Sequence, residues 1–271
     1  MMRLPPFIYL APARLDEAAR MLAEHGADAM AVAGGTDLYP NMKRRQFEPK
    51  VLVGLRGIRG LSEIAGDARE GMRIGAGATL TRVAEHPDVA THYPALARAA
   101  GVVSTPQLRN MGTLGGNVCV DTRCNYYNQS FEWRKSIGFC MKKDGDICLV
   151  APGSDRCWAV SSSDTAPVLW ALGAELTLVG PKGERRIPVR ALYQDDGIEY
   201  LTKRPDEIVS EVRLPAVDGW RATYWKLRRR GAFDFPVLGV AAAVRLEDGV
   251  CRDAKVVLGA VASTPREAPE V

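Results

Sequence analysis

The chain has 271 residues, of which 46% are hydrophobic, and it carries 36 Lys and Arg against 32 Asp and Glu. This composition suits a large buried core and two domains, and it argues against intrinsic disorder. The charges are scattered rather than gathered in tracts, so no nucleic-acid partner is expected. The first ten residues lack the pattern of a signal peptide and no apolar run reaches membrane-spanning length, so we expect a cytoplasmic protein with no membrane partner.

The first part of the chain predicts a mixed α/β order. Apolar residues at helical spacing follow Pro12, and Gly26 is placed to end that helix with a left-handed residue. A short apolar run then leads directly into Gly34 and Gly35. These patterns predict helices over 15–26, from 81 onward and over 93–100, and strands over 29–33 and 50–55.

Residues 119–163 resemble an insertion into this order. They hold five of the six cysteines and many charges, and they show no clear period. After them the patterns predict a helix over 164–172, a hairpin of strands 175–179 and 185–189, and a strand over 208–214. Residues 215–219 are the best linker candidate. Predicted strands at 224–228, 237–246 and 254–261 then form a meander with little to cover its faces.

Two glycine-rich loops, 34–36 and 112–117, predict a phosphate site. A diphosphate needs several converging backbone N–H groups, and glycine permits both the close approach and the positive φ angles that aim them. Each loop alone is typical of a plain turn, but the two loops together are stronger evidence for a phosphate site. Leu80 stands where a Rossmann fingerprint after Gly77 needs glycine, and a Walker loop is absent. The interpretation is a flavin site in which two loops hold one diphosphate.

Four cysteines inside the insertion predict a metal centre. They are Cys124, Cys140, Cys148 and Cys157. Four thiolates match a cubane iron–sulfur cluster or a zinc ion. Structural zinc usually recruits close cysteine pairs and none is present here, which favours iron–sulfur and leaves zinc open. The two remaining cysteines, Cys119 and Cys251, lie in apolar runs and are expected to be buried small hydrophobes.

Aromatic and basic residues accompany these cysteines. The aromatic residues would either screen a cluster from water or pack as in any long loop. The basic residues would either dock an acidic electron carrier or form a solvated face, and the solvated face is favoured. The aromatic residues are Tyr126, Tyr127, Trp133 and Phe139, and the basic ones are Arg123, Arg134, Lys135, Lys142, Lys143 and Arg156.

Three segments together carry a family resemblance: Ala33-Gly34-Gly35-Thr36-Asp37, the segment 110–117 (Asn-Met-Gly-Thr-Leu-Gly-Gly-Asn), and Ser163-Asp164-Thr165-Ala166-Pro167. They resemble the FAD-binding subunits of the molybdenum hydroxylases, the xanthine dehydrogenase group, and the resemblance runs nearly end to end. The insertion, with its Arg123-Cys124-Asn125-Tyr126-Tyr127 and Cys140-Met141-Lys142-Lys143, looks most like the beta subunit of 4-hydroxybenzoyl-CoA reductase. In that enzyme the extra segment carries a [4Fe-4S] cluster.

The resemblance implies which residues hold the cofactors. The diphosphate of FAD would lie between two stretches, with Val103 and Val209 lining the site, Asp164 making a polar flavin contact and Lys226 nearby. Cys124, Cys140, Cys148 and Cys157 would ligate the [4Fe-4S] cluster, and no residue of this chain is expected to be catalytic. The two stretches are Ala31, Val32, Ala33, Gly34, Gly35, Thr36, Asp37 and Leu38, and Thr113, Leu114, Gly115, Gly116 and Asn117.

The resemblance also implies an architecture. It is an α+β protein with a two-lobed FAD-binding domain of the vanillyl-alcohol-oxidase or PCMH type over 1–217, with the iron–sulfur loop inserted at about 119–163. A short C-terminal α+β domain, of the CO dehydrogenase flavoprotein type and apparently incomplete, would occupy 218–271. The family's charged stretch after the lysine is replaced here by residues 229–234, so no role is carried over to them.

The implied function is electron transfer within a complex. A ferredoxin-type donor would feed electrons through the [4Fe-4S] cluster and FAD toward a [2Fe-2S] small subunit and a molybdenum cofactor-binding large subunit, where an aromatic acyl-CoA is dehydroxylated reductively. One alternative is the FAD subunit of an aldehyde or xanthine dehydrogenase, with electrons running the other way. An alternative from another class is a zinc-stabilised binding module whose glycine loops are plain turns.

Overall fold

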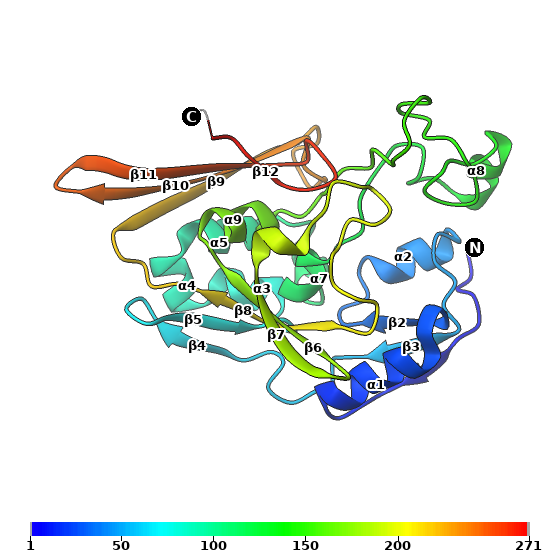
Figure 1. Cartoon of the computed structure of the whole chain (residues 1–271), viewed down its shortest axis with the longest axis horizontal. Coiled ribbons are helices and arrows are strands. Elements are labelled where there is room, and N and C mark those ends of the chain that lie inside the picture. The colour runs from blue at the N-terminus through cyan, green and yellow to red at the C-terminus, as the bar shows by residue number, and fades with distance from the viewer. Residues whose placement is uncertain (1, 270–271) are drawn as a thin grey trace.

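The computed structural model describes residues 2–269, and their strands form three sheets with helices packed between and around them (Figure 1). The first sheet is parallel, in the order β1-β3-β2. Its central strand is buried throughout because α1 packs on one side and a small cluster around Met42 of α2 covers the other. Its elements are β1 (Ile8–Leu10), α1 (Leu15–His25), a 3₁₀ turn (Gly26–Asp28), β2 (Ala29–Val32), α2 (Leu38–Lys43) and β3 (Val51–Gly54).

The second sheet is antiparallel, in the order β4-β5-β8-β6-β7. Helices α3, α5, α7 and α9 pack with it and with α1 into one continuous hydrophobic core. Its strands are β4 (Ile64–Asp67), β5 (Gly71–Gly75), β6 (Glu175–Gly180), β7 (Gly183–Pro188) and β8 (Ile208–Leu214). The helical elements are α3 (Leu80–Glu85), α4 (Pro87–His92), α5 (Pro94–Gly101), α6 (Pro106–Arg109), α7 (Leu114–Val118), α9 (Thr165–Ala171) and a 3₁₀ turn (Val189–Leu192).

The segment 119–163 forms a separate lobe with little regular structure. Its one described helix is α8 (Phe131–Ser136), and Figure 1 shows this lobe standing off from the sheets, above α2 in that view. Arg123 and Val160 exchange two backbone hydrogen bonds of 2.8 Å, which close the neck of the lobe. The segment is therefore an excursion between α7 and α9, as the sequence predicts for an insertion.

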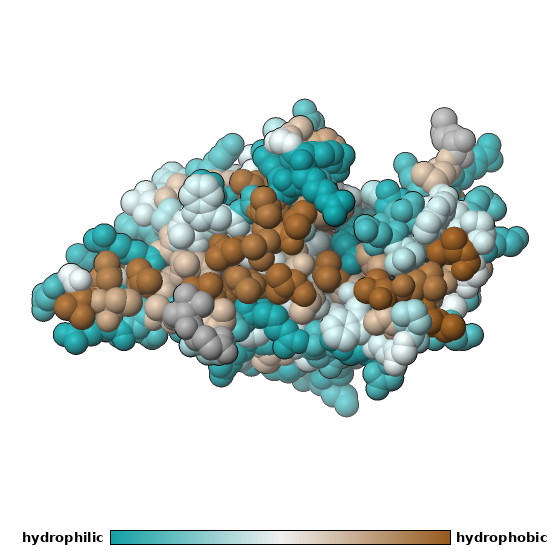
Figure 2. All heavy atoms as spheres, turned by 90° about the horizontal axis from the view of Figure 1, so that it is seen from above, coloured by the Kyte–Doolittle hydropathy of each residue, from teal (hydrophilic) through white to brown (hydrophobic). Residues whose placement is uncertain are grey.

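The third sheet is the C-terminal meander, in the order β12-β11-β10-β9. Its inner face packs on α5 and α9, so the expectation of uncovered faces is wrong for this side. The outer face is open. Trp225 and Leu227 are exposed on this face, and Figure 2, which views the molecule from above, shows a band of hydrophobic residues there. The strands are β9 (Trp220–Leu227), β10 (Leu238–Glu247), β11 (Val250–Gly259) and β12 (Arg266–Glu267).

The predicted helices and strands are found close to their expected limits. The hydrophobic periods are strong there, and Gly26, with φ of 52°, ends α1 as expected. The second glycine loop differs, because residues 114–118 wind into the short helix α7. Cys251 also differs: it is exposed on β11, next to the hairpin turn, rather than buried. None of the helices within residues 2–269 is long and apolar enough to cross a membrane.

Candidate functional site

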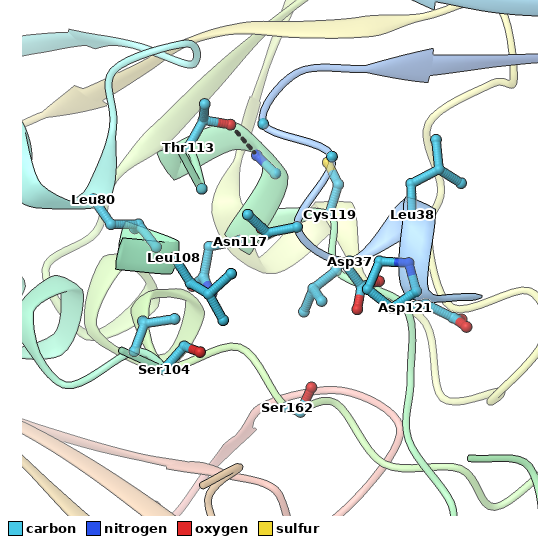
Figure 3. A pocket seen from close by; sticks show the side chains of 18 of the residues that line it. Asp37, Leu38, Leu80, Ser104, Leu108, Thr113, Asn117, Cys119, Asp121 and Ser162 are labelled. Carbon is cyan, nitrogen blue, oxygen red and sulfur yellow. Dashed lines mark hydrogen bonds between the residues drawn. The ribbon is translucent and has the colours of Figure 1, made fainter. Parts of the chain in front are cut away.

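A cavity of about 440 Å³ lies where the first sheet, α7, the neck of the insertion and the C-terminal sheet meet. This volume is in the range of pockets that hold cofactor-sized ligands. Figure 3 shows its walls, with Ser104 and Leu108 on one side and Asp37 and Asp121 on the other. The cavity is thus built from both predicted glycine loops and from segments far from them in sequence.

The first glycine loop lines the cavity, and neither of its glycines has room for a side chain. A Cβ on Gly34 would lie 2.0 Å from the carbonyl oxygen of Met111, which precedes the second loop. Gly35 has φ of 70°, in the left-handed region that favours glycine, and a Cβ there would strike the Tyr39 ring. The two glycines let the two loops come into contact, and residues of both loops line one cavity.

The second loop is held by capping and side-chain bonds. The Thr113 hydroxyl accepts a hydrogen bond from the Gly116 N–H at 3.1 Å, which caps α7 (Figure 3). The Asn117 side-chain oxygen accepts bonds from the Ser163 hydroxyl and from Thr165, at 2.7–3.2 Å. Asn117 therefore joins α7 to the start of α9 across the whole insertion.

A buried ion pair stands at the cavity wall where α9 and β9 meet. Lys226 Nζ lies 2.8 Å from Asp164 Oδ2, and the Tyr224 hydroxyl donates to Asp164 Oδ1 at 2.7 Å. Lys226 also donates to the carbonyl of Val102 at 3.2 Å. Burial raises the pKa of Asp164, which Lys226 and Tyr224 oppose, and burial with the Asp164 charge raises the pKa of Tyr224.

Most of the predicted flavin residues line this cavity. They are Ala31, Val32, Ala33, Gly34, Gly35, Thr36, Asp37, Leu38, Val103, Thr113, Gly116, Asn117, Asp164 and Lys226. Among the described lining residues, Leu114, Gly115 and Val209 are absent. Leu114 is fully buried, Val209 pairs with Leu178 inside the second sheet, and Gly115 packs against Ala76, 2.6 Å from where its Cβ would be. These three predicted residues therefore lie outside the described cavity lining.

Several lining residues were not predicted for the flavin site. Arg123 forms a close ion pair with Asp37, and its guanidinium stacks on Phe235 at 4.6 Å. Phe235, with Arg230, Phe233 and Asp234, comes from the loop between β9 and β10, to which no role was carried over. Their only signal is the aromatic and charged content of that loop, and long-range folding brings it to the cavity.

The four predicted cysteine ligands gather in the lobe. Cys140, Cys148 and Cys157 are buried and Cys124 is partly so. Burial raises the pKa of Cys124, which the N–H groups of Tyr126 and Tyr127 lower and the nearby Cys140 and Cys148 raise. Burial likewise raises the pKa of Cys157 to about 11, and its sulfur accepts a hydrogen bond from the Ala159 N–H at 3.4 Å. Cys124 is thus close enough to Cys140 and Cys148 to feel their charge, and Cys157 to that of Cys148.

These thiols are not assembled around a single ion. Within the described residues, no group of three or more His, Cys, Asp or Glu side chains is close enough to hold one metal ion. One tetrahedral zinc would bring its sulfurs to within about 4 Å of one another. A cubane cluster has four iron corners, each with its own thiolate, and holds its ligands farther apart. The assignment of these cysteines to a [4Fe-4S] cluster stays a prediction.

For three of the six basic residues of the lobe the expectation of a solvated face is wrong, whereas Lys135 is exposed and Lys143 and Arg156 are partly exposed. The side chains of Arg123, Arg134 and Lys142 are 9%, 1% and 6% exposed. Arg134 donates to the carbonyls of Arg44 and Arg45 at the end of α2. The prediction failed because lobe composition alone does not show which charges face the rest of the chain.

The cavity fits a large polar ligand with apolar parts. Its walls combine glycine loops, aliphatic side chains and the Asp164–Lys226 pair. At the wall near the insertion, Asp121 Oδ2 and Arg123 Nε are buried with no hydrogen-bond partner among the described residues. These two atoms have almost no exposed surface, so the fit of a flavin dinucleotide rests on the glycine loops and on the Asp164–Lys226 pair.

Two family models together match nearly the whole chain. The FAD binding domain in molybdopterin dehydrogenase matches residues 5–217, and the CO dehydrogenase flavoprotein C-terminal domain matches residues 222–271. The first model describes an FAD binding domain and covers most of the chain. It therefore argues against a zinc-stabilised binding module whose glycine loops are plain turns.

Known proteins with similar sequences and structures agree with these family matches. The chain is 33% identical to the aldehyde oxidoreductase FAD-binding subunit PaoB of Escherichia coli, over 91% of this chain and 79% of that protein. It is 29% identical to the carbon monoxide dehydrogenase medium chain of Afipia carboxidovorans, over 97% and 77%. The solved carbon monoxide dehydrogenase of Hydrogenophaga pseudoflava superposes with a TM-score of 0.79 at 27% identity, covering 99% of this chain and 79% of that one.

Proposed function

Because the chain belongs to the FAD-binding medium subunits of the molybdenum hydroxylase and CO dehydrogenase family, we propose that it carries electrons between bound FAD and a [4Fe-4S] cluster in its insertion. The observation that carries the proposal is the juxtaposition of the two candidate sites. Arg123 lines the cavity and pairs with Asp37, and the next residue is Cys124.

The chain's own residues would bind and orient the flavin. The loops at Gly34 and Thr113 would offer backbone N–H groups to the diphosphate, as glycine-rich turns do in other phosphate sites. The Asp164–Lys226 pair would position the flavin without acting as general acid or base, since the substrate chemistry is assigned to a partner. Bound FAD would supply the capacity to exchange electrons singly or in pairs.

The four cysteines would hold the cluster. Three of them are buried and Cys124 is partly buried, and the N–H groups of Tyr126 and Tyr127 at Cys124 and of Ala159 at Cys157 are of the kind that stabilise cluster thiolates. In this proposal a ferredoxin-type donor delivers electrons at the lobe, and the partners are a [2Fe-2S] small subunit and a molybdenum cofactor-binding large subunit. The finer assignment is a 4-hydroxybenzoyl-CoA reductase-like complex that dehydroxylates an aromatic acyl-CoA.

A second candidate function uses the same cofactors but transfers electrons in the opposite direction. The 33% identity to the aldehyde oxidoreductase subunit favours a complex that oxidises an aldehyde and passes electrons outward through FAD. Assays on the complete complex separate the two candidates. Oxidation of aromatic aldehydes without reduction of 4-hydroxybenzoyl-CoA supports the second, and the reverse supports the first.

Cofactor analysis of three variants tests the shared proposal. Protein purified without oxygen should release about one non-covalent FAD per chain on acid treatment and contain about four irons. Cys140→Ser should lose the iron and keep FAD, whereas Cys251→Ser, a control at an exposed thiol outside the lobe, should keep both. Recovery of FMN or of no flavin would refute the flavin assignment, and full iron in Cys140→Ser would refute the cysteine assignment.

A further inference from the structure

A buried lysine stands between the cavity and the four cysteines. Lys142 Nζ lies 2.8 Å from Asp121 Oδ1 and 2.7 Å from the Thr122 hydroxyl, and it donates to the Gly197 carbonyl. The side chains of Lys142 and Asp121 are each 6% exposed. A charge pair this deep keeps its electric field, because little water is present to screen it.

The two charges point to different sites. Asp121 lines the cavity, on the same side as Asp37 in Figure 3, whereas Lys142 is not among the described lining residues. Lys142 donates to the carbonyl of Gly197, which packs against the Cys157 sulfur, and Lys142 lies two residues after Cys140. The pair is therefore a dipole, with its negative end at the cavity and its positive end toward the cysteines.

Packing fixes this orientation. The Lys142 ammonium lies 4.8 Å from the ring of Tyr127 and 5.5 Å from that of Tyr200. The Gly197 N–H donates to the Cys157 carbonyl at 2.9 Å, and a Cβ on Gly197 would come within 2.6 Å of the Cys157 sulfur. The ammonium and the thiol thus share one neighbour, and neither end of the pair is free to turn around.

We propose that the Lys142–Asp121 pair sets the difference in reduction potential between the group held by the four cysteines and the flavin. This inference rests on the proposed function. A cation beside the cluster stabilises its reduced form, and a carboxylate at the cavity opposes electron uptake by the flavin. The pair therefore raises the potential of the cluster relative to that of FAD, and it acts by position and charge, without touching substrate.

The test is a set of charge variants in the complete cofactor-loaded protein. Lys142→Met removes the positive end, Asp121→Asn removes the negative end, and the double variant removes both. Lys135→Met is the matched control, because it removes an exposed lysine of the same lobe. The readout is the midpoint potential of each cofactor in an anaerobic titration, followed by electron paramagnetic resonance for the cluster and by absorbance for FAD.

The variants have opposite expected signs. Lys142→Met should lower the cluster potential by an amount equivalent to about tenfold in the ratio of reduced to oxidised form, or ~59 mV for one electron. Asp121→Asn should raise it, the double variant should fall between, and Lys135→Met should match the unaltered protein. A purely structural role for Lys142 predicts loss of iron or shifts of the same sign.

Each remaining result decides the matter. Iron-containing Lys142→Met and Asp121→Asn proteins that both match the control would overturn this inference and leave the proposed function standing. If Lys142→Met loses its iron, Asp121→Asn alone decides: a raised cluster potential supports the inference, and an unchanged one overturns it. If the unaltered protein contains no iron, the cluster assignment fails and this inference fails with it.

Discussion

The contact between the two glycine loops is the residue-level feature most sensitive to substitution. A Cβ at position 34 would overlap the carbonyl of Met111, so Gly34→Ala must push the loops apart. We expect FAD affinity to fall at least about tenfold, which corresponds to ~1.4 kcal/mol. Gly57→Ala is the control, because no atom lies within 4 Å of its Cβ position. Equal FAD affinity in the two variants, measured by titration of apoprotein, would show that the loops do not hold the flavin.

The Asp164–Lys226 pair makes a second residue-level prediction. Breaking one side of a buried pair leaves an uncompensated charge, which costs about 3–5 kcal/mol. Asp164→Asn should therefore lower the free energy of unfolding by that order and weaken FAD binding, and the double variant with Lys226→Met should recover part of the stability. Urea unfolding of the apoprotein measures the first effect and flavin titration the second. Additive losses in the double variant would contradict a coupled pair.

At this scale, the sequence predicts cavity residues only where a residue type, such as glycine, restricts or permits a particular backbone conformation. Gly34, Gly35 and Gly116 line the cavity together with most of their neighbours, whereas Leu114 and Gly115 do not. Arg123 and Phe235 were missed because their positions depend on contacts between the neck of the insertion and the β9–β10 loop. Local sequence carries no record of such contacts.

At the level of elements, one carboxylate ties β7 to the start of β8. Glu207 accepts two bonds from the Arg185 guanidinium, at 2.6 and 2.9 Å, and one from the Arg204 N–H at 2.7 Å. The bonds from Arg185 are the main reason that the pKa of Glu207 falls to about 2. Because this value lies below that of the unfolded chain, the stabilisation is present above pH 4.5 and is lost as the pH falls toward 2.

Glu207→Gln should therefore destabilise the protein in a pH-dependent way. Arg185 is 41% exposed, so solvent screening limits the effect to about 1–2 kcal/mol at pH 7. The difference from the unaltered protein should narrow by about pH 3, as measured by urea unfolding at both pH values. Glu184→Gln serves as the control, because it changes an exposed carboxylate next to Arg185 on β7. A difference that does not depend on pH would contradict the ion-pair account.

The docking of the lobe onto α2 also belongs to this scale. Arg134 Nη2 donates to the carbonyls of Arg44 at 2.9 Å and Arg45 at 3.1 Å, and its guanidinium lies 5.9 and 5.8 Å from the ring centroids of Phe131 and Phe139. Arg134→Met should loosen the lobe and speed its cleavage by chymotrypsin about thirtyfold, since two bonds of about 1 kcal/mol each are lost. The exposed neighbour variant Lys135→Met should be cut at the unaltered rate. Similar rates in both variants would mean that other contacts hold the lobe.

The elements themselves follow from local patterns. Periods of apolar residues place α1, β2 and β8 within a residue or so of their predicted limits. The interior of 119–163 has no such period, so the sequence could mark it as an insertion but not predict that α8 and Arg134 dock on α2. The buried charges of the lobe were misjudged for the same reason.

At the scale of the whole molecule, the parts form two adjoining candidate redox sites. The flavin cavity lies among the sheets, the cysteines lie in the lobe, and the Asp37–Arg123 pair and the Lys142–Asp121 pair occupy the neck between them. The outer face of the C-terminal sheet remains apolar and open. The sequence predicts that both faces of this meander are largely uncovered. It does not predict that α5 and α9 pack on the inner face.

An electron count tests the account most directly. Anaerobic titration of the purified protein with dithionite should consume about three electrons per chain, about two at the flavin absorbance and about one at a cluster signal. Cys140→Ser should consume about two, all at the flavin. Uptake of about two electrons by the unaltered protein, with no signal other than that of the flavin, would contradict the claim that this chain links FAD to an iron–sulfur cluster.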